Sequence, residues 1–189
     1  MKMSEKKVGK KRKRVSEDDG ERAAKKKKVE RLRRKVLKES RGICEFSKID
    51  DDIFISSGAF TRKQIGHHRV KAVVNCAEEL SGGAFRECVN LEGLDYLELQ
   101  MEDRATLESR DKFKEATKFI EKAVSENKKV LVHCVNGISR SPAIVASYLM
   151  KKNGWTWDQA IREVRSKRPQ ANPLVFEVQL ENYGNTLFK

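Results

Sequence analysis

Residues 130–150 read VLVHCVNGISRSPAIVASYLM, which combines an apolar run, a short turn and a helical pattern. Its first part, VLVH, is apolar enough for a buried strand, and SPAIVASYLM has a proline in the first turn of an expected helix. The seven-residue turn between them, CVNGISR, contains Gly137, which permits a positive φ and close approach of the backbone. A strand, a tight turn and a helix in this order indicate an anion site, because inward N–H groups and the helix N-terminus both attract negative charge.

Cys134 is the candidate nucleophile of this turn. The positive field that would hold a phosphate also favours the thiolate of Cys134, which is the reactive form of cysteine. Arg140 follows six residues later, where its planar guanidinium can bind two phosphate oxygens and stabilise transition-state charge. Isolated cysteines at strand ends are commonly unreactive buried thiols. The combined spacing of His133, Cys134, Gly137, Arg140 and Ser141 favours the reactive interpretation.

The chain from residue 42 onward has the alternating strand and helix patterns of an α/β domain. Two of its expected strands are almost continuously apolar, as central strands covered on both faces should be. We therefore expect one domain over 42–189, with a central, mostly parallel sheet flanked by helices. The expected strands are 53–57, 70–75, 96–101 and 130–133.

Helical periodicity is clearest at 109–127, where apolar residues recur at spacings of three and four. A second helix is expected at 141–152, and a third ends near residue 167 after a capping box at Thr156. Asn172, followed by a proline, predicts the start of a last helix with the asparagine as its cap.

The segment HCVNGISRS, 133–141, resembles the signature of the protein tyrosine phosphatase superfamily, and specifically the small, atypical members of the dual specificity branch. The resemblance covers most of 42–180. It implies a protein tyrosine phosphatase-like fold and a two-step reaction through a phosphocysteine intermediate, with no cofactor and no metal. Further matching landmarks are 53–58, 73–75, 96–103, 141–142, 148–150, Ala160, 168–169, Phe176 and 179–180.

The same resemblance implies roles for individual residues. Asp103, thirty-one residues before Cys134, matches the aspartate that protonates the leaving oxygen and then acts as a base toward water. Ser141 matches a hydroxyl that helps the thiolate leave in the second step, and it would also suit a helix cap. His133 is expected to support the loop rather than transfer protons. The expected phosphate-binding residues are Val135, Asn136, Gly137, Ile138, Ser139 and Arg140.

The expected substrates are proteins that carry phosphotyrosine, phosphoserine or phosphothreonine. The variable side chains of the turn are uncharged, whereas a site for a polyanionic inositide or an RNA triphosphate would be expected to add lysine or arginine there. Asn136 stands where many relatives have alanine, so hydrogen bonding and substrate fit are open at that position. The alternative is an RNA 5′-phosphatase or a phosphoinositide phosphatase, and a non-catalytic phosphoprotein-binding scaffold ranks last.

Residues 1–41 contain 19 basic and 7 acidic residues, which accounts for +12 of the net charge of +13. This composition predicts a disordered tail, or a partly helical one over 21–40 with a thin apolar stripe. Basic clusters at 10–14 and 25–28 have the spacing of a bipartite nuclear-localisation signal, which predicts a nuclear import receptor as a partner. Nonspecific nucleic acid binding by 1–41 is also open. We expect the nucleus, including the nucleolus, with the cytoplasm as the alternative.

The remaining composition argues against membranes and disulfides. No apolar stretch approaches the roughly 20 residues that span a bilayer, and the N-terminus lacks the apolar region of a signal peptide. We therefore expect no membrane partner and a reducing compartment in which Cys44, Cys76, Cys88 and Cys134 are thiols. Their spacing does not suit a zinc site. A protective disulfide between oxidised Cys134 and Cys76 or Cys88 stays open as a hypothesis.

Overall fold

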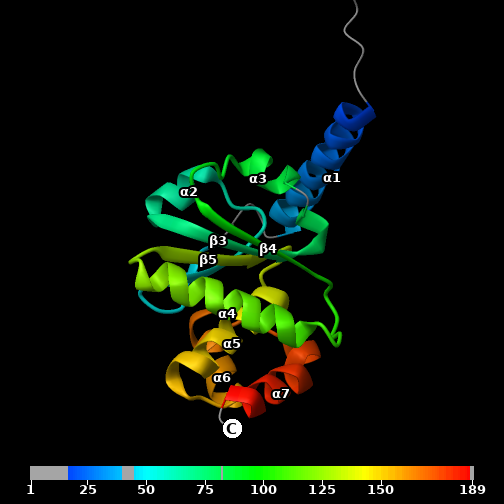
Figure 1. The fold of residues 1–189 in the computed structure, drawn as a ribbon. Helices are drawn as coiled ribbons and strands as arrows, with labels where there is room; N and C mark the ends of the chain where they lie inside the picture. The colour runs from blue at the N-terminus through cyan, green and yellow to red at the C-terminus, as the bar shows by residue number, and fades with distance from the viewer. Residues whose placement is uncertain (1–16, 40–44, 82, 188–189) are drawn as a thin grey trace, which may run out of the picture.

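A computed structural model describes residues 17–39, 45–81 and 83–187 of the chain. The fold is a five-stranded sheet in the order β1-β2-β5-β3-β4, with helices on both faces (Figure 1). Strand β1 pairs antiparallel with β2, and the other three pairings are parallel. The strands are β1 Ser47–Lys48, β2 Ile53–Ser57, β3 Val70–Ala77, β4 Asp95–Met101 and β5 Lys129–Cys134.

The helices form two layers around the sheet. Figure 1 shows α1 to α3 on one face and α4 to α7 on the other. The first layer contains α1 Glu17–Glu39, α2 Arg62–His67 and α3 Ala84–Val89, with the 3₁₀ turn η1 at Glu78–Leu80. The second layer contains α4 Ser109–Ser125, α5 Arg140–Asn153, α6 Trp157–Lys167 and α7 Glu177–Leu187, which η2 Leu174–Phe176 precedes. The expected α/β class with a mostly parallel sheet is confirmed.

The central strand β5 determines where the site lies. It pairs with β2 on one side and β3 on the other, and its side chains are buried from Val130 to Cys134. All three strands are parallel, so their carboxyl ends meet at one edge of the sheet. The register places Ser57 of β2 beside Cys134 and Asn75 of β3 beside His133. Loops that follow β2, β3, β4 and β5 therefore converge around Cys134.

Helix α5 is the most deeply buried helix of the described part of the chain. Every residue from Arg140 to Met150 is buried, which agrees with its position between the sheet and helices α4, α6 and α7. It ends at Gly154, whose φ of 67° gives the left-handed cap that glycine tolerates best. Helix α6 opens with the expected capping box between Thr156 and Gln159.

The last helix begins differently from the expectation. Asn172 does not cap it: its side-chain oxygen accepts a hydrogen bond from Arg165 at 3.3 Å, and its N–H donates to Ile138 at 2.7 Å. The chain then forms η2, and the α-helix starts only at Glu177. The Asn-Pro pair thus connects this segment to the turn after β5, and that tertiary contact replaces the local cap.

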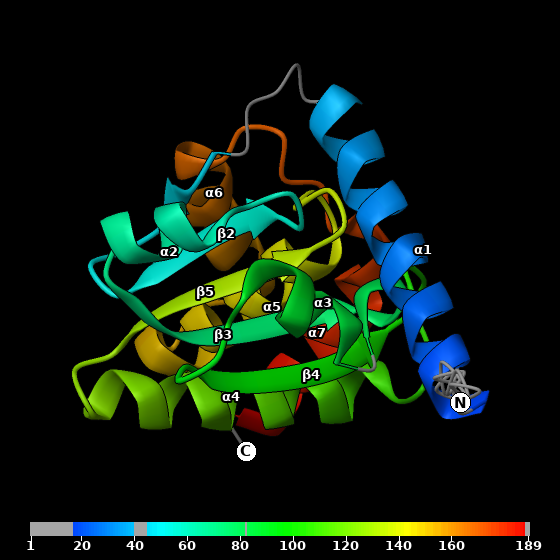
Figure 2. The ribbon, with the colours of Figure 1, turned by 90° about the horizontal axis from the view of Figure 1, so that it is seen from above.

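The basic tail contains a docked helix. The sequence left disorder and a helix open for this region, and the structure forms α1 over Glu17–Glu39. Its apolar stripe faces the domain, with Val29 and Val36 buried and Leu32 packed against the core. The helix packs on α3 and runs past the end of the sheet where the turn after β5 lies (Figure 2).

Candidate active site

The turn after β5 folds back on the sulfur of Cys134. The backbone N–H of Gly137 donates to Sγ at 3.1 Å, and the hydroxyl of Ser141 donates to the same sulfur at 3.4 Å. Cys134 is 2% exposed, so the sulfur lies at the base of the loop. Donors aimed at a sulfur stabilise its anionic form, which is the nucleophilic one. The structure therefore brings Cys134, Gly137 and Ser141 together as expected.

Gly137 can be only a glycine in this loop. Its φ is 70°, and a Cβ at this position would lie 2.7 Å from the carbonyl oxygen of Ser56 and 2.6 Å from Nη2 of Arg168. Both neighbours are held in the interior, so neither can move away cheaply. The tight loop thus depends on the missing side chain.

Arg168 supports the loop from outside, and the sequence reasoning did not assign it to the site. Its guanidinium donates to the carbonyl oxygen of Gly137 at 2.6 Å, to that of Asn136 at 3.5 Å and to the Ser47 hydroxyl at 3.0 Å. Arg168 is 4% exposed. Because it binds loop carbonyls, it leaves the loop N–H groups free to face inward. The signal was present as the Arg-Pro pair after α6, which was interpreted from the sequence as a helix end and a family landmark without a role in the site.

The guanidinium of Arg140 is the buried cation of the site. Its Nη1 donates to Glu79 at 2.5 Å and to the carbonyl oxygen of Met101 at 3.0 Å, while Nη2 donates to Glu79 at 3.1 Å. The Nε of Arg140 is buried and has no hydrogen-bond partner among the described residues. A buried donor without an acceptor is costly, and a phosphate oxygen is the acceptor that would satisfy it.

Glu79 is the second residue that sequence reasoning missed. It lies in η1 after β3, and its carboxylate is half exposed while the paired Arg140 side chain is 3% exposed. Burial works against ionisation of Glu79, yet the hydrogen bonds from Arg140 give its pKa a net shift below the ordinary value. For Arg140, burial opposes the charge and Glu79 more than offsets it, so its pKa is raised. Glu79 therefore orients the guanidinium.

Asp103 lies beside Arg140. It follows β4, and its Oδ1 is 3.7 Å from Nε of Arg140, too long for a hydrogen bond but within ion-pair distance. Its side chain is 51% exposed, so it can reach a bound substrate from the solvent side. A carboxyl group in this place can exchange a proton with an oxygen held by Arg140. The expected acid is thus located at the site.

His133 is enclosed by aromatic rings below the loop. Its ring stacks on Phe85 at 4.7 Å between centroids and meets the edge of Phe60 at 5.0 Å. Complete burial is the main reason that its pKa falls to about 3, and the charges of Arg33 and Arg140 lower it further. A neutral, enclosed imidazole fits the expected structural role.

The four remaining turn residues differ in how far their side chains are exposed to solvent. Val135 is buried, and its carbonyl oxygen accepts a hydrogen bond from Gly58 at 2.9 Å. Ser139 is half-buried, and its hydroxyl oxygen has no hydrogen-bond partner among the described residues. Asn136 and Ile138 point their side chains outward, and Ile138 is 38% exposed. The outer rim of the loop is therefore uncharged.

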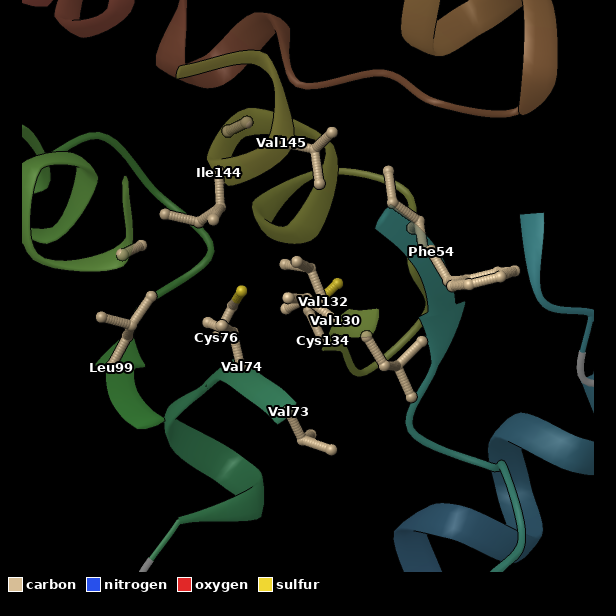
Figure 3. Close-up of a cluster of buried hydrophobic side chains, with 14 of the residues drawn as sticks. Phe54, Val73, Val74, Cys76, Leu99, Val130, Val132, Cys134, Ile144 and Val145 are labelled. Carbon is tan, nitrogen blue, oxygen red and sulfur yellow. The ribbon is translucent and has the colours of Figure 1, made fainter. Parts of the chain in front are cut away.

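Two further cysteines are described: Cys76 lies near Cys134, and Cys88 lies on α3. Figure 3 shows Cys76 and Cys134 in one buried cluster beneath α5, together with Val74 and Val132. Burial raises the pKa of Cys76 well above its ordinary value, and the neighbouring Cys134 adds to that shift. Cys88 lies on α3 and is half-buried, whereas Cys44 falls outside the described residues. The described residues contain no group of three or more His, Cys, Asp or Glu side chains placed to hold a metal.

Curated proteins with similar sequences are phosphatases by name. The chain is 44% identical over 78 residues to tyrosine-protein phosphatase yvh1 of Schizosaccharomyces pombe, covering 41% of this chain and 24% of the relative. It is 37% identical over 94 residues to dual specificity protein phosphatase 22 of Mus musculus, covering 49% and 51%. Protein phosphatase Slingshot homolog 3 of Rattus norvegicus is 31% identical over 144 residues, covering 75% and 21%. The chain thus spans from about a fifth to a half of the length of these relatives.

Solved structures share the fold. Human DUSP28 superposes with a TM-score of 0.68 at 26% identity, covering 76% of this chain and 95% of that chain. A mouse dual specificity phosphatase described as complexed with zinc tungstate gives 0.66 at 28% identity, covering 75% and 87%. The family model for the dual specificity phosphatase catalytic domain matches residues 53–186, which include every expected site residue. The chain therefore belongs to the dual specificity phosphatase catalytic domain family.

Proposed function

We propose that this protein removes phosphate from phosphotyrosine and from phosphoserine or phosphothreonine in proteins. One observation carries the proposal: the sulfur of Cys134 receives two hydrogen bonds at the base of a loop, and the same loop leads into Arg140, whose buried Nε has no hydrogen-bond partner among the described residues. A phosphate monoester placed there would meet a nucleophile below and a cation beside it. Membership of the family adds support.

In the proposed first step, the sulfur of Cys134 attacks phosphorus and an S–P bond forms while the P–O bond to the substrate breaks. Asp103 gives its proton to the departing oxygen, so the product leaves as an alcohol or phenol. The spread of charge over the phosphoryl oxygens is balanced by Arg140 and by loop N–H groups.

In the proposed second step, water attacks the phosphocysteine and loses a proton to the carboxylate of Asp103. The S–P bond then breaks, inorganic phosphate forms, and the electron pair returns to the sulfur. The hydroxyl of Ser141, 3.4 Å from that sulfur, stabilises the departing thiolate. The phosphocysteine is the species that distinguishes this pathway from direct hydrolysis.

Protein substrates are favoured over highly charged ones by the rim of the site. Asn136 and Ile138 are exposed there and neither carries a charge. A phosphoinositide or an RNA triphosphate would gain most from lysine or arginine side chains at these positions. The uncharged side chains of Asn136 and Ile138 suit a single phosphate on a peptide.

A substrate panel tests the assignment. Purified protein would be assayed for phosphate release from phosphotyrosine peptides, phosphothreonine peptides, RNA 5′-phosphates and phosphoinositides, with Cys134→Ser as the control. We expect release from the peptides and at least about a hundredfold less from the Cys134→Ser protein. A preference for RNA 5′-phosphates would show that the substrate is RNA and not a phosphorylated protein. Binding of phosphopeptides without any hydrolysis would instead support a scaffold.

We also propose import into the nucleus through the basic residues of the N-terminal region. The cluster at 25–28 lies on α1 with exposed side chains, so it is presented on a helix. The cluster at 10–14 lies outside the described residues. A fluorescent fusion with alanines at 25–28 should leave the nucleus partly, and an unchanged distribution would argue against this cluster. Binding of the same variant to RNA would test the nonspecific nucleic acid contact.

A further inference from the structure

Arg33 joins the basic helix α1 to the loop that follows β2. Its Nε donates to the carbonyl oxygen of Gly58 at 3.1 Å, and its Nη2 donates to that of Phe60 at 2.6 Å. One rigid guanidinium thus binds two carbonyls that lie two residues apart, which fixes the shape of the loop between them. The helix itself is anchored beside this contact by the buried Val29 and Val36.

That loop in turn touches the catalytic turn. The N–H of Gly58 donates to the carbonyl oxygen of Val135, the residue after the nucleophile, at 2.9 Å. A Cβ at Gly58 would lie 3.1 Å from the carbonyl oxygen of Cys134 and 2.6 Å from a methyl group of Leu80, so the backbones are in close contact. A shift of the loop after β2 would therefore displace the backbone of Cys134 and Val135.

A second route runs from Arg33 through the aromatic rings. Its guanidinium carbon lies 5.7 Å from the centroid of Phe85, and its Nη2 binds the backbone of Phe60. These two rings enclose His133, which directly precedes Cys134. Arg33 thus contacts the groups next to two residues at the C-terminal end of β5. These groups are Gly58, which binds Val135, and the two rings that enclose His133.

We propose that Arg33 is a positioning residue for the phosphatase reaction, acting from α1 on the β2 loop and thereby on the catalytic turn. Helix α1 then contributes to catalysis through Arg33, in addition to its positive charge. The inference rests on the proposed function for its kinetic readout. Small displacements of a catalytic group reduce rate strongly, so loss of this contact should act mainly on turnover.

The test compares four substitutions in the full chain: Arg33→Ala, Arg33→Lys, Arg34→Ala and Val29→Ala. Arg33→Ala removes the contact to both carbonyls. Arg34→Ala removes the same charge from an exposed neighbour on α1, and Val29→Ala weakens the packing of the helix while keeping Arg33. Thermal unfolding by circular dichroism would establish a temperature at which the wild type and the four variants are all folded. Hydrolysis of 4-nitrophenyl phosphate and calorimetric binding of orthovanadate, which imitates the transition state, would then be measured.

We expect Arg33→Ala to lower kcat about tenfold and weaken vanadate binding about tenfold, with KM changed by less than about twofold. Arg34→Ala should match the wild type, and Arg33→Lys, which can reach one carbonyl at a time, should recover part of the loss. Equal effects of Arg33→Ala and Arg34→Ala, equal effects of Arg33→Ala and Val29→Ala, or no effect of Arg33→Ala would each overturn the proposal. If the wild type hydrolyses no phosphate ester, the proposed function fails, while vanadate binding still decides the role of Arg33.

Discussion

Glu79 holds Arg140 through both terminal nitrogens of the guanidinium, at 2.5 Å to Nη1 and 3.1 Å to Nη2. This pairing takes one edge of the guanidinium and leaves Nε, on the other edge, without a hydrogen-bond partner among the described residues. A phosphate that accepts from Nε can therefore bind beside Glu79 without replacing it. The carboxylate orients the cation and partly neutralises it.

Replacing Glu79 with glutamine tests this arrangement. Glu79→Gln keeps the shape of the side chain but removes its charge, so the guanidinium loses part of its orientation. Because the carboxylate is half exposed, solvent screens the pair, and we expect kcat/KM for aryl phosphates to fall only about fivefold, or about 1 kcal/mol. Steady-state kinetics measure this. Faster turnover in Glu79→Gln would show that the pairing inhibits the enzyme instead.

Gly137 provides a prediction with a matched control in the same chain. Gly137→Ala would place a Cβ against the backbone of Ser56 at a φ of 70°, so we expect a loss of about 2 kcal/mol of stability and of most activity. Gly154 has a φ of 67°, yet a Cβ there would meet no atom within 4 Å. Gly154→Ala should cost about 1 kcal/mol and leave kcat unchanged. Chemical denaturation and kinetics on both variants check the difference.

His133 makes stability depend on pH. Its folded-state pKa is about 3, below the value of about 6.5 in an unfolded chain, so the unfolded state binds the proton more readily between these values. The stability from the neutral, buried ring is complete above pH 6.5 and is lost as pH falls toward 3. We expect this group to contribute a slope of about 1 kcal/mol per pH unit near pH 5.

Urea denaturation from pH 4.5 to 7.5 measures the slope. In His133→Gln the slope should flatten, because the titrating ring is gone. His67→Gln, at an exposed position on α2, should leave the slope as in the wild type. A slope that persists in His133→Gln would assign the pH dependence to other groups.

Asp103 should matter most where the leaving group is poor. Asp103→Asn cannot donate a proton, so we expect kcat on phosphotyrosine peptides to fall about a hundredfold, and less on a substrate whose leaving oxygen needs no proton. Glu102 is the neighbouring control, because its carboxylate pairs with Arg104 and does not contact Arg140. Glu102→Gln should retain nearly full activity. Equal losses in the two variants would remove Asp103 from the mechanism.

The sequence predicted those parts of the fold that local chemistry determines. The strand at 53–57 was placed with the observed bounds, and the other three long strands were placed within two residues at each end. Two of the four are almost continuously apolar, as buried parallel strands are, whereas β4 lies at the edge of the sheet and is only partly buried. Helices α2 and α3 were missed, since six residues give little periodicity. Helix α2 nevertheless begins with a Thr61–Gln64 capping box, the same signal that identified α6.

The residues of the site likewise fall into those that the sequence predicted and those that it could not. Cys134, Gly137, Arg140 and Ser141 lie in one short segment, so their spacing alone indicated a phosphate site. Contacts made by distant residues could not be predicted, because they depend on the sheet order. Glu79 reaches Arg140 only because β3 lies beside β5, and Arg168 and Arg33 approach the loop from helices on opposite faces of the sheet.

The phosphocysteine is the central claim, and acid quenching tests it most directly. Wild-type protein mixed with a phosphotyrosine peptide would be quenched within the first turnovers, digested, and analysed by mass spectrometry. We expect one phosphate group on the peptide that contains Cys134, appearing with substrate and decaying as substrate is consumed, and absent in Cys134→Ser. Sustained turnover with no modified Cys134 peptide, together with retained activity in Cys134→Ser, would contradict it.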